Sequence, residues 1–405
     1  MKIVKSKAML YIASGLMLWA LLASACSTGF ALGNRSAATS TPTPLPVSEI
    51  SNQNSELFAA FWQAWQLIHD KYVDQPVDDT ALMRGAIKGM LEALGDEHSA
   101  YMDPFQYKDA TTSLQGEYEG IGAWVNTDGK FLTITEPMPG SPAEKAGLKP
   151  GDQIIAIDGA DMTGILPELA RRKVLGTKGT TVVLTILRDG EEKPFDVEVT
   201  RASINVPSVI SKMLEGDVAY IRLYTFGETT TKELRAALDT LLAEKPVGLI
   251  LDLRNNGGGY LQTGIEVASE FIEKGVIVIE ESGDGTRENF EALPGGKATD
   301  IPMVVLVNKY SASASEIVAG AIQDHARGKL VGETTFGKGS VQSWIPLVDD
   351  QGAVRITIAR WLTPNGRLIH KVGLTPDVEV ARTEADTQAE KDPQLDKAVE
   401  LLTQQ

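Results

Sequence analysis

Serines interleaved with alanines follow an apolar run in the C-terminal half of the chain. Residues 301–307 (IPMVVLV) predict a buried strand, and Ser311-Ala312-Ser313-Ala314-Ser315 follows shortly after it, before a helix-like stretch. A serine at such a turn can act as a nucleophile, because the free N–H groups at a helix start stabilise nearby negative charge. The structural alternative is a capping box, in which Ser313 begins the helix and Glu316 reaches back to it.

A lysine between two glycines is the second chemical feature. Lys338 follows Gly337, precedes Gly339 and has no acidic residue within four positions. An ordinary lysine has a pKa near ~10.4, so it acts as a base at neutral pH only where burial lowers that pKa, by up to ~3–5 units. A neutral lysine that glycines allow to approach a serine could take the serine's proton. The alternative is a solvated surface lysine.

The same stretch partly fits a phosphate-binding P-loop. Residues 332–338 match its first seven positions, but the eighth must be Ser or Thr to hold magnesium and is Gly339 here. Residues 341–346 also predict an extended segment where a P-loop needs a helix. We therefore do not expect nucleotide hydrolysis.

Three consecutive glycines end another predicted strand. Residues 251–259 read LDLRNNGGG, so a strand opens into Gly257, Gly258 and Gly259. Bare glycine N–H groups can face the negative charge that develops on a reacting carbonyl oxygen, and each such donor contributes ~3–4 kcal/mol. The alternative is a plain flexible turn.

The surrounding residues predict the elements that must position these motifs. Between residues 56 and 94 apolar residues recur at helical spacing, and we expect the Trp and Phe side chains there to belong to a core. Residues 113–201 contain short β-rich runs cut by Asp-Gly turns. From residue 206 continuous apolar strands alternate with helices, which is typical of a buried sheet. The sequence therefore predicts a multidomain α/β (α+β) protein that ends in a helix over residues 392–402.

Composition excludes several classes of function. The chain has 405 residues, of which 43% are hydrophobic, enough for two or three domains. A net charge of −16 disfavours phosphate backbones, so we expect no nucleic-acid partner. The four histidines show no metal-binding spacing, so we expect no metal site and no cofactor, and we interpret the lone His98 as structural.

The N-terminal residues have the order of an export signal. Three lysines precede an uncharged apolar stretch (residues 8–25), which ends in small residues directly before Cys26, the single cysteine. This ending resembles a bacterial lipobox, which implies acylation of Cys26; ordinary signal cleavage and an uncleaved anchor are the alternatives. Residues 27–50 are rich in Ser, Thr and Pro and predict a linker. We therefore expect an exported, extracytoplasmic protein that a lipid anchors to the cell membrane.

Residues 140–159 (GSPAEKAGLKPGDQIIAIDG) resemble a bacterial PDZ domain. In that family the C-terminal end of a peptide adds as a strand to a sheet edge, and loop amides hold its carboxylate. The matching loop here is Gly120-Ile121-Gly122-Ala123, for which a simple hairpin is the alternative. Many members carry an arginine where this chain has Leu175, and Arg171 or Arg172 is the candidate to replace it.

The chemical motifs together resemble the carboxyl-terminal processing proteases, also called tail-specific proteases. The resemblance rests on LDLRNNGGG, on VNKYSASASEIVAGAIQD (307–324), on TFGKGSVQ (335–342) and on GDEHSAYMDP near the N-terminus, and covers about residues 55–385. It implies a serine endopeptidase with a Ser–Lys dyad and an acyl-enzyme. The site residues that it implies are the nucleophile Ser313, the general base Lys338, Gln342 to orient the lysine, the oxyanion-hole amides of Gly258 (or its neighbour) and Ala314, and Asp324 as a supporting acid. One departure is Gly257, where members often have Pro or Ser.

The predicted organisation follows from these assignments. The expected segments are a lipoprotein-type signal peptide (1–26), a linker (27–50), a helical region (51–112), a PDZ domain (113–201), a catalytic core (202–385) and a helical tail (386–405). The expected partners are proteins or peptides with free C-terminal tails, besides the membrane. An inactive tail-binding adaptor is the alternative function, and an envelope scaffold is a weaker one. The sequence predicts neither an oligomeric state nor an activating partner.

Overall fold

The computed structural model describes residues 56–383, 385–386, 389 and 391–404. The predicted signal peptide, Cys26 and the predicted linker lie outside the described residues. The chain divides into two compact units, residues 1–83 and residues 84–405. Across the described part of the chain, none of the helices combines the length and the apolar character that a membrane span requires.

The described part of the first unit contains helix α3 (Ala59–Lys71) and the start of α4 (Asp79–Glu92). The helical prediction is confirmed, but the expectation of a core is wrong for α3, which has no buried residue. Its aromatic rings contact one another along the helix, with the Phe61 and Trp62 centroids 5.1 Å apart. Neighbours on a single helix cannot exclude water from all sides, so Trp62 stays 60% exposed.

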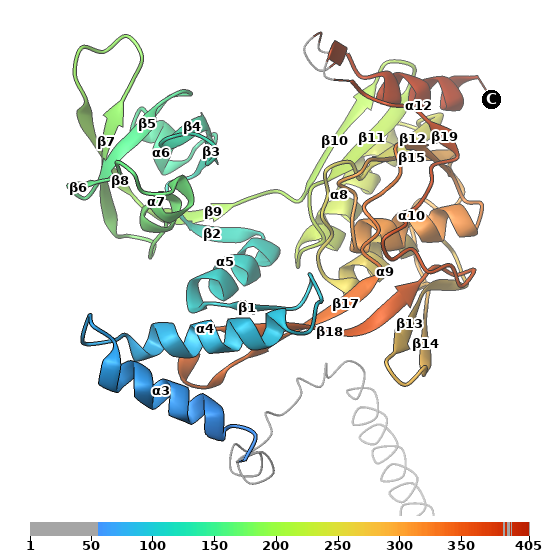
Figure 1. Cartoon of the computed structure of the whole chain (residues 1–405). Helices are drawn as coiled ribbons and strands as arrows, with labels where there is room; N and C mark the ends of the chain where they lie inside the picture. Colours follow the sequence, from blue (N-terminus) through green and yellow to red (C-terminus); the bar gives the residue numbers. More distant parts are fainter. Residues whose placement is uncertain (1–55, 384, 387–388, 390, 405) are drawn as a thin grey trace, which may run out of the picture. The chain divides into compact units, whose positions relative to one another are not determined.

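A six-stranded sheet belongs to the C-terminal part of the second unit (Figure 1). Its strand order is β10-β11-β12-β15-β16-β19, in which β10 pairs antiparallel and the other strands run parallel. The strands are β10 (Val209–Leu214), β11 (Val218–Leu223), β12 (Gly248–Asp252), β15 (Met303–Val307), β16 (Lys329–Gly332) and β19 (Val378–Glu379).

Helices cover both faces of this sheet, which explains its continuous apolar strands. One face packs against three helices, and the other packs against the C-terminal helix. The helices are α8 (Thr230–Ala243), α9 (Leu261–Ser269) and α10 (Ala314–Asp324) on the first face, and α12 (Pro393–Thr403) on the second. Alternate residues of β12 divide between the faces: Leu249 and Leu251 belong to the first core and Ile250 to the second. The predicted C-terminal helix is thereby confirmed.

A second sheet of the core is built from antiparallel hairpins. Its strands pair in the order β1-β18-β13-β14, and β17 also pairs with β18. The strands are β1 (Ala100–Met102), β13 (Val276–Ser282), β14 (Arg287–Glu291), β17 (Ser340–Pro346) and β18 (Ala353–Leu362). This sheet joins residues far apart in the sequence, because β1 comes from the N-terminal region and pairs with β18 through Ala100 and Arg355.

The β-rich segment forms a separate small sheet with its own core. The sheet order is β3-β4-β5-β7-β8, with β6 beside β5. The elements are β3 (Ala123–Asn126), β4 (Leu132–Pro137), α6 (Pro142–Lys145), β5 (Gln153–Ile157), β6 (Ala160–Asp161), α7 (Pro167–Val174), β7 (Thr181–Leu187) and β8 (Phe195–Thr200). A two-stranded ribbon of β2 (Glu117–Gly120) and β9 (Ala202–Asn205) follows helix α5 (Pro104–Gln115) and carries the chain into and out of this domain.

Candidate active site

The turn between β15 and α10 separates the roles of the three serines. Ser311 and Ser315 are fully buried, and their hydroxyls donate to the carbonyl oxygens of Leu253 and Asn256, each at 2.8 Å. These two serines therefore fasten the turn to the loop after β12. Ser313 lies between them, half-buried, with the unusual backbone angles φ 56° and ψ −119°. A non-glycine residue keeps such a conformation only where its surroundings enforce it, and strain of this kind clusters at functional sites.

The carboxylate of Glu316 holds the serine turn and the lysine loop together. Its Oε2 atom accepts hydrogen bonds from the backbone N–H of Ser313 and of Lys338, both at 2.9 Å. Its Oε1 atom accepts from the Thr335 hydroxyl at 2.6 Å and from the Gly337 N–H at 2.7 Å. The Ser313 and Lys338 nitrogens thus lie no farther apart than the sum of two hydrogen bonds. The predicted capping box is confirmed, but the same side chain also brings together the two residues that the sequence singled out.

Burial and hydrogen bonding oppose each other at Glu316. The side chain is fully buried, and this burial raises its pKa, while the four donors favour the ionised form. A carboxylate has about four lone-pair sites, so two hydrogen bonds on each oxygen occupy its acceptor sites. The negative charge beside the site therefore has a fixed place.

Lys338 lies in the loop that leads into strand β17, so no helix follows it and the P-loop alternative is excluded. Burial lowers the pKa of its amine, nearby Arg355 lowers it further, and Glu316 opposes both. The backbone carbonyl of Lys338 accepts a hydrogen bond from the Trp361 indole at 2.8 Å, which fixes the loop. In the described residues no hydrogen bond joins the Lys338 amine to the Ser313 hydroxyl, although their backbones are adjacent.

Gly258 packs directly against the serine turn. A Cβ atom at this position would lie 2.7 Å from Ser313 Cβ and 2.8 Å from the Ala312 oxygen, and its φ is +98°. Only glycine fits such a place. The Gly258 N–H donates to Asn256 Oδ1 at 2.9 Å, so that amide already has a partner. The N–H groups of Gly257 and Ala314, by contrast, have no acceptor within the described part of the chain.

The two remaining catalytic candidates lie in different places. Gln342 is on β17, and its amide nitrogen donates to Ser340 Oγ at 2.8 Å and to Thr357 Oγ1 at 3.1 Å. Asp324 is at the far end of α10 from Ser313, about 16 to 17 Å along the axis at 1.5 Å per residue. It pairs with Arg367 and accepts from the Asn365 N–H, so the structure does not bring it to the serine or the lysine. The helix that the sequence places between them explains this separation.

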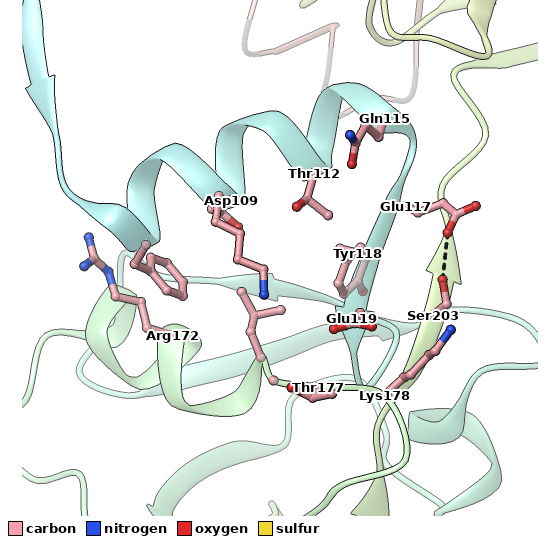
Figure 2. A pocket seen from close by; sticks show the side chains of 14 residues that line it. Asp109, Thr112, Gln115, Glu117, Tyr118, Glu119, Arg172, Thr177, Lys178 and Ser203 are labelled. Carbon is pink, nitrogen blue, oxygen red and sulfur yellow. Dashed lines mark hydrogen bonds between the residues drawn. The ribbon is translucent and has the colours of Figure 1, made fainter. Parts of the chain in front are cut away.

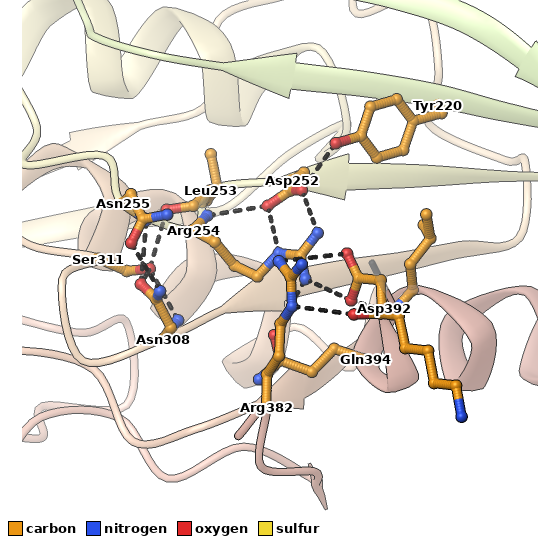
Figure 3. A network of polar contacts seen from close by, with 12 residues as sticks. Tyr220, Asp252, Leu253, Arg254, Asn255, Asn308, Ser311, Arg382, Asp392 and Gln394 are labelled. Carbon is orange, nitrogen blue, oxygen red and sulfur yellow. Dashed lines mark hydrogen bonds and ion pairs between the residues drawn. The ribbon is translucent and has the colours of Figure 1, made fainter. Parts of the chain in front are cut away.

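A buried polar network surrounds Arg254, which precedes the glycine loop in the sequence (Figure 3). Arg254 donates to both oxygens of the fully buried Asp252, at 2.9 and 2.6 Å. It also donates to Asp392 at 2.8 Å and to Gln394 at 3.0 Å, at the start of α12. The C-terminal helix thus fixes the residue that precedes the Asn-Asn-Gly-Gly-Gly turn. Buried charges are stable only when they are paired in this way.

The small β-rich domain carries an apolar groove beside the loop that the sequence predicted. Ile121, Ala123 and Val125 line it from the loop and from β3, and Arg171 and Val174 line it from α7. Alternate strand residues face one side, so this is the geometry for adding a peptide strand between β3 and α7. Figure 1 shows β3 and α7 in the same small domain.

The arginine candidates near Leu175 have definite positions. Arg171 lines the apolar groove and pairs with Asp109 and Glu168, both at 2.8 Å. Arg172 lines a neighbouring polar hollow and pairs with Asp103 at 3.3 Å. Figure 2 shows this hollow, with Asp109 and Thr112 from α5 facing Thr177 and Lys178. Of the two arginines, only Arg171 lines the groove.

Sequence reasoning missed the contribution of the segment before β1. Burial lowers the pKa of His98, and the charge of nearby Lys338 lowers it further. Its ring centroid is 6.1 Å from that of His370, whose buried Nδ1 atom has no hydrogen-bond partner among the residues that the structure describes. Asp96 accepts a hydrogen bond from Thr357, opposite Gln342. The Asp-Glu-His-Ser motif at residues 96–99 could have indicated a part of the site. Because it is far from Ser313 along the chain, the sequence did not show that the two lie close together.

Models of three protein families match parts of the chain. The family model for peptidase family S41 matches residues 217–380, the PDZ domain model matches 111–187, and the model for the N-terminal domain of the activating protease CtpB matches 25–105. The carboxyl-terminal-processing protease of Synechocystis is 41% identical over 350 residues, covering 84% of this chain and 82% of the relative.

Further relatives extend the match. The carboxy-terminal processing protease CtpB of Bacillus subtilis is 40% identical over 324 residues, covering 78% of this chain and 66% of the relative. A solved structure, the photosystem II D1 C-terminal processing protease, has a TM-score of 0.50 and 30% identity and covers 85% of this chain and 96% of its own. The chain therefore belongs to the carboxyl-terminal processing proteases, serine-type peptidases of family S41 that carry a PDZ domain.

Proposed function

We propose that this protein cleaves polypeptides with a Ser313–Lys338 dyad after its PDZ domain has captured their free C-terminal tails. The observation that carries the proposal is the Glu316 carboxylate, which accepts from the backbone N–H of both residues through one oxygen. The positive φ of Ser313 and the lowered pKa of the half-buried Lys338 amine support the same proposal. In the proposed mechanism the lysine side chain rotates so that its amine contacts the Ser313 hydroxyl.

The chemistry follows from these positions. Neutral Lys338 takes the proton of Ser313 Oγ, and the oxygen attacks the scissile carbonyl carbon. The resulting oxyanion is stabilised by backbone N–H groups, for which Ala314 and either Gly257 or Gly258 are the donors. Gly258 serves only if its N–H leaves Asn256. The protonated lysine then gives its proton to the leaving amine, and water hydrolyses the acyl-enzyme.

The PDZ groove supplies the tail specificity in this proposal. An extended tail pairs with β3, its apolar side chains enter the groove between β3 and α7, and its carboxylate meets the amides of residues 120–123. We further propose that acylated Cys26 anchors the protein outside the cytoplasm. Labelling with a fatty-acid analogue tests the anchor: wild type should be labelled and Cys26→Ser should not.

The direct test is cleavage of an unstructured polypeptide that ends in apolar residues. Ser313→Ala should abolish cleavage while the protein stays folded, and unchanged turnover would reject the dyad. Ser315→Ala is the matched control, because it loses one buried hydrogen bond, worth about 1 kcal/mol, but retains the nucleophile. The same substrate with an amidated C-terminus should raise KM, because the amide cannot replace the carboxylate at the loop.

A further inference from the structure

A β-bulge places Gln342 directly opposite Thr357. Strands β17 and β18 pair with Val341 opposite Ala359 and then Gln342 opposite Thr357, so Ile358 is the extra residue. Bulges next to active sites commonly re-aim a side chain. Here the bulge lets the Gln342 amide nitrogen donate to Thr357 Oγ1 at 3.1 Å.

The Thr357 hydroxyl has a single proton, and it donates that proton in a hydrogen bond to Asp96. Thr357 Oγ1 donates to Asp96 Oδ2 at 2.6 Å. An ionised carboxylate has no proton to give, so the hydroxyl can only accept from the other side. The NH₂ group of Gln342 must therefore face Thr357 and Ser340 Oγ, and its carbonyl oxygen must point away from both.

Asp96 is itself held ionised and in place. It accepts from the Ser99 hydroxyl at 2.6 Å and from the His98 N–H at 3.0 Å. Burial opposes ionisation, but these hydrogen bonds and that from Thr357 prevail and lower the pKa of Asp96 to about 2. The Thr357 N–H in turn donates to Ser99 Oγ at 3.0 Å, which fastens this loop to β18.

The same loop lies beside the proposed base. Arg355 donates to the His98 carbonyl oxygen at 2.8 Å, and both the Arg355 charge and the Lys338 charge act on this small region. The ionisable groups around the lysine are His98, Arg355 and Glu316. Gln342 lies on β17, which begins two residues after Lys338. Its side-chain carbonyl oxygen points away from Thr357.

We propose that Asp96 is a positioning residue for the base: through the Thr357 hydroxyl it fixes the Gln342 amide with its oxygen free to accept from the Lys338 amine. This inference rests on the proposed Ser–Lys function. It assigns a catalytic purpose to the Gly-Asp-Glu-His-Ser segment, which reaches the site only because β1 extends the sheet beside β18.

Thr357→Val tests the relay without removing any other contact of Asp96. It removes the hydroxyl and keeps the shape, so the Gln342 amide is free to flip. We expect kcat to fall about 10- to 100-fold, because misplacing a catalytic group has effects of this size. We expect KM to stay within about twofold, because the change does not touch the tail-binding groove. Thr357→Ser keeps the hydroxyl and should restore most of kcat.

Two further variants separate positioning from stability. Tyr101→Phe removes the hydrogen bond that the Tyr101 hydroxyl of β1 donates to the Gln351 carbonyl oxygen, but leaves Asp96, Thr357 and Gln342 connected, so it should lower the melting temperature and keep kcat. Asp96→Asn should lose activity as Thr357→Val does, and the double variant should be no slower than Thr357→Val alone, because both break the same relay.

The outcomes distinguish the relay from the dyad. A Thr357→Val enzyme with kcat within twofold of wild type would overturn the relay, as would an equal loss of kcat in Tyr101→Phe. If Ser313→Ala is inactive in the same assay, such a result leaves the dyad intact. Full activity in Ser313→Ala would instead reject the proposed function.

Discussion

Glu316→Gln should both destabilise the protein and separate the two halves of its site. The glutamine has the same shape but only one acceptor oxygen, whereas the carboxylate accepts from four donors. Whichever way the amide turns, its NH₂ group faces at least one backbone N–H in a fully buried place. An unsatisfied buried donor costs about 1–3 kcal/mol, and the weakened charge-assisted bonds add to this. We therefore expect a loss of about 2–4 kcal/mol.

The assay is urea unfolding followed by tryptophan fluorescence, together with cleavage of the tail substrate under conditions where the variant is folded. Activity should fall far more than the folded fraction, because the Ser313 and Lys338 backbones lose their shared acceptor. Glu333→Gln is the matched control, since this glutamate is in the loop that carries Lys338 and its side chain makes no hydrogen bond within the described part of the chain. A Glu316→Gln protein with wild-type unfolding and wild-type cleavage would refute this account of the site.

Three further changes test other parts of the structure. Lys338→Met should abolish activity and raise the melting temperature below neutral pH. Because burial lowers the lysine pKa in the folded state, this gain in melting temperature should shrink as pH rises above that pKa. Wild-type activity should climb between pH 6 and 9, and flat pH profiles of activity and melting temperature would count against a base whose pKa burial lowers. Gly258→Ala should lower the free energy of unfolding by at least about 1–2 kcal/mol, because residue 258 has a left-handed backbone, and it should lose activity because the new Cβ contacts the serine turn. Gly257→Ala has open space around the new Cβ and should keep the fold, and thermal melts and cleavage assays check both variants. Arg254→Met should lower the free energy of unfolding in urea by about 3–5 kcal/mol, because it leaves buried carboxylates unpaired. Arg382→Met breaks only a half-exposed ion pair and should lower it by at most about 1 kcal/mol, so equal losses in the two variants would contradict the network.

Elements with strong local signals were predictable from the sequence. The apolar strand 218–223 and the C-terminal helix were expected close to where the structure has them, because both depend on periodic patterns within one segment. The aromatic stripe of α3 was misjudged for a related reason. Helical spacing shows that Trp62 shares a face with its neighbours, but it does not show what covers that face.

The choice among the serines could not be made from spacing. Ser311, Ser313 and Ser315 are equivalent in the sequence. What distinguishes the outer two is that they donate to carbonyl oxygens of a loop some 55–60 residues upstream. Asp324 is an example of the opposite kind: it is close to Ser313 in the sequence, but helix α10 separates the two residues in space.

The amino-acid sequence by itself determined the types of group available for chemistry: a serine at a helix start, a lysine free of close acidic neighbours, and glycines where no side chain fits. These depend on local backbone preferences and on residue chemistry. Only the tertiary structure decided that Glu316 joins the serine turn to the lysine loop, and that Asp96 reaches Gln342 across β18. Such contacts form between segments that sheet pairing brings together, and sheet register is set by the packing of the whole core.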